Sequence, residues 1–149
     1  MIDVMDSLWL MTAVSLLVMG LTMLVLWRLK PTDYVALAFG AGTILQSARF
    51  GLAVITQGGS VPAAFLNDVL QVCVLSLAWI ANLYTVGRKP PLQLIATVAA
   101  LVAVAAVSLR ATGHGMLWGG FDIDTIIVAL FLPIAFILLT AKRPDNRYA

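Results

Sequence analysis

Charge is what this sequence has least of. Only 11% of its 149 residues are charged, whereas soluble domains average about 25%. All seven acidic residues are aspartates, so glutamate is absent. Hydrophobic residues make up 62% of the chain, and the mean hydropathy is +1.02. This balance excludes an ordinary soluble domain and indicates helices surrounded by lipid.

Cysteine and histidine occur once each, as Cys73 and His114. A lone cysteine inside an apolar run can form neither an intrachain disulfide nor a metal–thiolate cluster. His114, Asp122 and Asp124 fall in one loop, but carboxylates at the start of a helix usually cap it, so we expect no metal site. The absence of histidine from the apolar runs also excludes haem held by two histidines, and we expect no cofactor.

Long apolar runs dominate what is present. A helix needs about 20 mostly apolar residues to cross a bilayer, and lipid forces such a segment to be helical because unpaired backbone groups are costly there. The first run is too long for a signal-peptide core, so we interpret it as a retained helix. The expected helices are residues 8–27, 33–55, 62–86, 91–109 and 125–141. The predicted fold is an all-α integral membrane protein, a bundle of five transmembrane helices forming one transmembrane domain over residues 1–149.

The breaks between these helices have identifiable local chemistry. Thr32 or Asp33 can cap the second helix, and Gly87, followed by two cations and two prolines, can end the third. Pro133 falls inside the fifth helix and is expected to kink it, because proline lacks a backbone N–H.

Basic residues gather on one side of this five-helix arrangement. Seven of the nine do so: Arg28, Lys30, Arg88, Lys89, Lys142, Arg143 and Arg147. By the positive-inside rule this side is cytoplasmic, which places the N-terminus outside and the C-terminus in the cytoplasm. The expected location is the inner membrane of a bacterial-type cell, as a multi-pass protein.

Two ionisable residues interrupt the second and third runs, Arg49 and Asp68. At about 1.5 Å of rise per residue, Arg49 lies roughly 24 Å from the cytoplasmic face and Asp68 roughly 9 Å below the outer face. In a core about 30 Å thick these depths nearly match, so we expect the two side chains to meet in the outer half of the bundle.

Other polar residues share the faces of these two. Gln46 precedes Arg49 by three residues on the second helix, while Gln71 and Asn82 follow Asp68 along the third. The first helix carries a stripe of Thr12, Ser15, Met19 and Thr22, so a polar seam is expected to run through the bundle. The seam is either a ligand pocket, proton relay or switch, or an ion pair with polar contacts that fixes helix packing. In a third interpretation, Arg49 extends to the outer interface.

Several segments resemble the N-terminal membrane region of bacterial diguanylate cyclases of the GGDEF family. The resemblance covers roughly the first 90 residues and is carried by residues 27–31 (WRLKP), 36–40 (ALAFG), the Arg49 region, Val61-Pro62 and 84–90 (YTVGRKP). It implies a sensor or anchor that precedes a cytoplasmic cyclase. Residues 119–123 (GGFDI) only resemble the catalytic motif, because the acids are misplaced. The sequence up to Ala149 contains no cyclase domain, so no catalytic residue carries over, and we expect either a sensor half without its output or a stand-alone relative.

These patterns predict a non-enzymatic sensory or scaffolding module that signals to a cytoplasmic output domain or partner. No pair of nucleophile and base is evident, which argues against an enzyme. One alternative is a small transporter or channel subunit that uses the Arg–Asp seam as its path. Another is an accessory subunit of a membrane complex. The expected partners are the lipid bilayer and a second copy or another membrane or cytoplasmic protein, and not a nucleic acid.

Overall fold

Four long helices make up most of the fold. The computed structural model describes residues 4–56, 61–112, 116–117 and 121–122, with the single positions 128, 132, 136 and 140. The helices are α1 (Val4–Leu29), α2 (Tyr34–Thr56), α3 (Val61–Thr85) and α4 (Leu92–Ala111). They are the first four expected helices, with each end within about one turn of its expected place. A short antiparallel pair, β1 (Met116–Leu117) and β2 (Phe121–Asp122), follows them.

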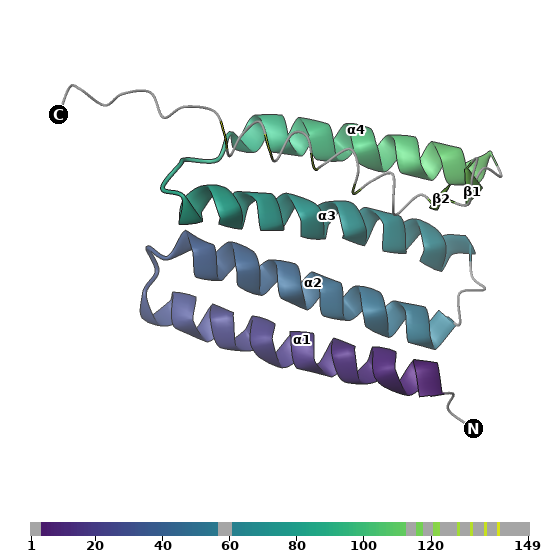
Figure 1. Cartoon of the computed structure of the whole chain (residues 1–149), viewed down its shortest axis with the longest axis horizontal. Coiled ribbons are helices and arrows are strands. Elements are labelled where there is room, and N and C mark those ends of the chain that lie inside the picture. The colour runs from purple at the N-terminus through teal and green to yellow at the C-terminus, as the bar shows by residue number, and fades with distance from the viewer. Residues whose placement is uncertain are drawn as a thin grey trace.

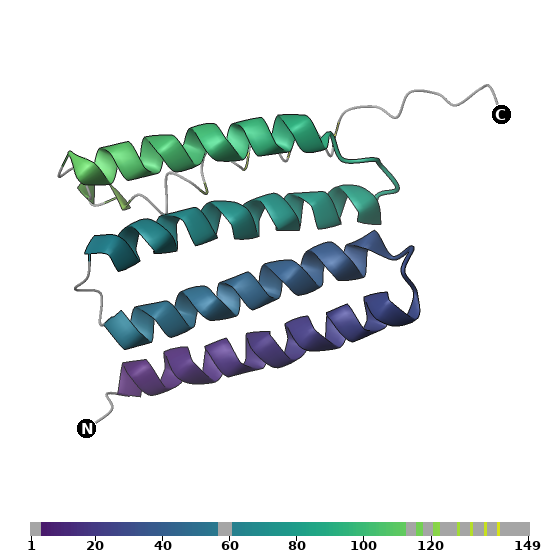
Figure 2. The same cartoon turned by 180° about the vertical axis from the view of Figure 1, so that it is seen from behind.

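The four helices lie side by side in chain order, each antiparallel to the one before (Figure 1). The view from behind shows the same row, with α2 and α3 in the middle (Figure 2). The loops after α1 and after α3 therefore share one end of the row. We call this the basic end, since Arg28, Lys30, Arg88 and Lys89 lie there. The starts of α1 and α3 and the ends of α2 and α4 share the opposite end.

Local chemistry sets the helix ends at the basic end. The Asp33 carboxylate accepts a hydrogen bond from the backbone N–H of Ala36 at 3.1 Å, which caps the start of α2. Gly87 adopts a φ of 70° after α3. Its N–H donates to the carbonyl of Tyr84, and the N–H of Arg88 donates to that of Leu83, which is a Schellman ending. The expected roles of Asp33 and Gly87 are confirmed.

Helices α1 and α2 pack tightly against each other at two glycines. A Cβ on Gly20 would lie 2.6 Å from Ile44 Cγ1, and one on Gly40 would lie 3.0 Å from the carbonyl oxygen of Gly20. About two turns along the same interface, the Ser47 hydroxyl donates a hydrogen bond of 2.6 Å to the carbonyl of Ala13. Small residues therefore bring the two backbones together, as is common in membrane helix pairs.

An apolar cluster joins α3 to α4. Its buried members are Val72, Trp79, Leu83, Ile95, Val102 and Ala106. They follow helical spacing on the facing sides of the two helices, so this interface is held by side-chain packing over most of its length.

Large apolar side chains also cover the outside of the row. Along α1 they include Met11 at 68% exposure and Val18 at 59%. The hydroxyls of Thr12, Ser15 and Thr22 donate to the backbone carbonyls four residues earlier, which satisfies them without water. All four helices are long and apolar enough to cross a bilayer, the architecture of a multi-pass membrane protein.

The expected fifth helix falls mostly outside the described residues, as do Pro133 and His114. The described positions Val128, Leu132, Phe136 and Thr140 are helical, and the Thr140 hydroxyl donates to the Phe136 carbonyl at 2.7 Å. A complete helix over 125–141, its kink and the orientation of the chain in the membrane stay predictions.

Candidate functional site

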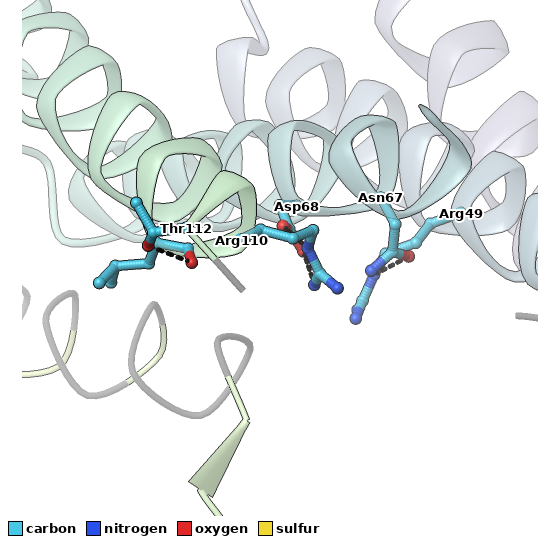
Figure 3. A network of polar contacts seen from close by, with 6 residues as sticks. Arg49, Asn67, Asp68, Arg110 and Thr112 are labelled. Carbon is cyan, nitrogen blue, oxygen red and sulfur yellow. Dashed lines mark hydrogen bonds and ion pairs between the residues drawn. The ribbon is translucent and has the colours of Figure 1, made fainter. Parts of the chain in front are cut away.

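A buried ion pair joins α3 to α4. Arg110 Nε lies 2.6 Å from Asp68 Oδ2, and Arg110 Nη2 lies 2.7 Å from Oδ1 (Figure 3). The Asp68 side chain is completely buried, and that of Arg110 is 25% exposed. A guanidinium that donates a hydrogen bond to each of the two carboxylate oxygens makes a strong, directional contact. The pair therefore fixes the end of α4 against α3 where their apolar cluster stops.

Arg49 contacts the neighbouring residue of α3 instead. Its Nε donates a hydrogen bond of 2.9 Å to Asn67 Oδ1. The expected depth was nearly right, because Asn67 directly precedes Asp68. The expected partner was wrong, since adjacent helical residues point about 100° apart. Asn67 is turned toward α2 and Asp68 toward α4, and α3 lies between those two helices (Figure 3).

Sequence reasoning missed Arg110 because the fourth helix was expected to end at Leu109, which left Arg110 in an outer loop. The structure places it in the last turn of α4. Helical side chains lean toward the N-terminus of their own helix, so Arg110 points back into the bilayer. Asp68, near the start of α3, leans toward the same level from the opposite direction. These opposite directions of the two side chains could have identified Arg110 as a partner of Asp68 from the sequence.

A pocket of about 240 Å³ opens beside the ion pair, at the end of the row opposite the basic end, which we call the pocket end. It is lined by Trp9, Arg49, Phe50, Leu52, Ala53, Thr56, Ala63, Ala64, Asn67 and Arg110. Trp9 and Phe50 meet edge to face there, with ring centroids 5.0 Å apart. The wall thus combines two guanidiniums and an amide with aromatic and small apolar groups, and all four described helices contribute to it.

Two glutamines of the expected seam lie deeper, on α2 and α3. Gln71 is buried and Gln46 is half-buried. The Oε1 atom of each is shielded from solvent and has no hydrogen-bond partner among the described residues. Gln46 also lines a second cavity of about 160 Å³ between α1, α2 and α3. These unsatisfied acceptors lower stability unless another group pairs with them.

The rest of the expected seam is not buried. Asn82 is exposed, and so are Thr12, Ser15, Met19 and Thr22 of α1. The hydroxyls in this stripe are bonded to their own helix, so they do not need to face a polar interior. The polar groups therefore form a cluster near the pocket end, and the seam does not continue along α1. In the described part of the chain, no group of three or more potential metal ligands occurs.

Comparison with protein-family models, curated proteins and solved structures finds no significant match to this chain.

Proposed function

We propose that this chain is a non-enzymatic sensory module of a bacterial-type inner membrane. In this proposal the pocket end faces outward, the basic end faces the cytoplasm, and the output is a cytoplasmic domain or partner protein. The grouping of Arg28, Lys30, Arg88 and Lys89 supports this orientation, because positively charged loops are retained in the cytoplasm. The resemblance of the first 90 residues to cyclase membrane regions supports a role in signalling.

The observation that carries the proposal is the position of the Asp68–Arg110 pair. Arg110 lines the pocket and also forms the ion pair that holds α4 to α3. A ligand that interacts with the guanidinium would change the strength of the Asp68–Arg110 ion pair. Beyond it, the apolar cluster connects α3 to α4 as far as Leu83 and Ile95, close to the basic end. A change in the pocket can therefore shift the relation of α4 to α3 at the other side of the membrane, provided that the ligand prefers one arrangement.

The transporter alternative requires a polar path across the membrane. In the described part of the chain, the interface between α3 and α4 is apolar from Val72 to Leu83. Between α3 and α4, this arrangement favours transmission of a conformational change over passage of an ion. The accessory-subunit alternative is supported only by the exposed face of α1, which lipid also explains.

Hydrogen–deuterium exchange on the chain in nanodiscs tests transmission. We expect Arg110→Gln to change exchange at the pocket end and also in the loop 86–91 at the basic end. Arg28→Gln, at an exposed position of the basic end, is the matched loss of a cation and should leave the pocket end unchanged. A change confined to the surroundings of Arg110 would refute transmission. Ion flux through liposomes containing the chain would favour the transporter instead.

A further inference from the structure

The pocket beside the ion pair has a chemical character that points to a class of ligand. Among the described residues, the charged groups of its wall are the guanidiniums of Arg49 and Arg110. The nearby carboxylate, Asp68, is fully buried and lies behind the wall, where Arg110 covers it. A ligand in the pocket therefore lies next to the N–H donors of two guanidinium groups.

The polar groups converge from three helices. Arg49 comes from α2, Asn67 from α3 and Arg110 from α4, and both guanidiniums lie on the same side of α3 (Figure 3). Guanidinium groups present planar sets of N–H donors that match the oxygens of carboxylates and phosphates. In surroundings of low dielectric constant such contacts are stronger than in water. The remaining wall is mostly apolar, with Trp9, Phe50, Leu52 and alanines, and the hydroxyl of Thr56 donates to the Leu52 carbonyl.

We infer that this pocket binds an oxyanion carried on an apolar body. The charged group would contact Arg49, Arg110 and the amide of Asn67, and the apolar body would lie against Trp9 and Phe50. A free amphiphilic carboxylate and the headgroup region of an anionic lipid share this chemistry. The inference names the ligand class for the sensory role and so rests on that proposal, but binding is measured separately from transmission.

The experiment uses the full chain in nonionic detergent and follows its unfolding temperature, which rises when a ligand binds the folded state. Phenylacetate is the free anion, and phenylacetamide is its uncharged control. Phosphatidylglycerol is the anionic lipid, and phosphatidylcholine is its control. We expect one or both anions to stabilise the protein and the two controls to have little effect. Stabilisation by phosphatidylglycerol alone would assign the site to lipid.

Variants locate the binding. Arg49→Gln should weaken the effective anion affinity by about tenfold or more, because it removes a charged hydrogen-bond donor. Arg49→Lys should retain part of the affinity, and Arg28→Gln at the basic end should retain all of it. If Arg49→Gln does not fold, Ala53→Phe fills the pocket while keeping both arginines, and it should abolish anion binding.

Equal stabilisation of the wild type and the pocket variants by the anions would overturn the inference, as would the absence of any anion effect. If the anions bind but exchange at loop 86–91 does not change, the ligand class stands and transmission is the part that fails.

Discussion

At the scale of single residues, Asp68 shows why its partner matters. Its carboxylate is 0% exposed, so it has no water to replace a lost partner. Removing one member of a buried ion pair leaves the other uncompensated, which costs about 3–5 kcal/mol. Removing both members costs less, because no buried charge remains.

A double-mutant cycle tests this pairing through unfolding in detergent. We expect Asp68→Leu and Arg110→Leu each to lower the free energy of unfolding by about 3–5 kcal/mol, less any relief from snorkelling to the interface. The double variant should lose much less than the sum. The same cycle with Arg49→Leu in place of Arg110→Leu should give a smaller coupling. Additive losses for Asp68 and Arg110 would contradict the pairing.

Substitution of Gln71 is expected to stabilise the protein. Its Oε1 is buried without a hydrogen-bond partner among the described residues, and such a group costs about 1–3 kcal/mol. Gln71→Leu, which keeps a similar volume, should therefore raise the free energy of unfolding by about 1 kcal/mol. Ser76→Ala on the same helix is a suitable control, since its hydroxyl is satisfied by the Val72 carbonyl. A loss of stability in Gln71→Leu would mean that the amide has a partner that stabilises the fold.

At the scale of elements, hydropathy was enough to predict the four described helices, because a spanning segment must be long, apolar and helical. The cap at Asp33 and the glycine ending at Gly87 were also predictable, since each depends on residues close in sequence. The Asp68–Arg110 pair was not predictable, because it depends on which side of α3 the helices α2 and α4 occupy. A shift of one residue along a helix changes the direction of the side chain by about 100°. The Gly20–Gly40 contact was also missed, because it depends on which faces of α1 and α2 meet. Nothing in the neighbouring sequence distinguishes these two glycines from the others.

The glycine crossing between α1 and α2 gives a matched pair of substitutions. In Gly20→Ala the new methyl group would lie 2.6 Å from Ile44 Cγ1 and 2.9 Å from the Gly40 carbonyl oxygen. The two helices must move apart, so we expect a loss of about 1–3 kcal/mol in the free energy of unfolding. Gly51→Ala on α2 has nothing within 4 Å of the added carbon. It should be neutral or stabilising by about 0.5–1 kcal/mol, because alanine favours the helix. Equal effects of the two substitutions would show that α1 and α2 do not pack through Gly20.

At the scale of the whole molecule, antiparallel packing decides what shares a side of the membrane. Alternation from α1 to α4 places both cation-bearing loops at the basic end, and it places the pocket and the ion pair at the other (Figure 1). Loop cations resist transfer across a membrane during insertion, so the basic end is cytoplasmic in the proposed orientation. A pocket near the outer surface would then be open to molecules outside the cell or in the outer leaflet.

Single cysteines introduced into a Cys73→Ser background test this orientation in intact cells. Thr32→Cys lies at the basic end and Met5→Cys at the pocket end, both at exposed positions, and neither removes a cation that directs topology. We expect a membrane-impermeant maleimide to label Met5→Cys and to leave Thr32→Cys unlabelled until the cells are opened. Labelling of Cys73 itself, which is exposed on the side of α3, measures the background from lipid-facing thiols. If Thr32→Cys is labelled from outside and Met5→Cys is protected, the pocket faces the cytoplasm and the proposed direction of signalling is wrong.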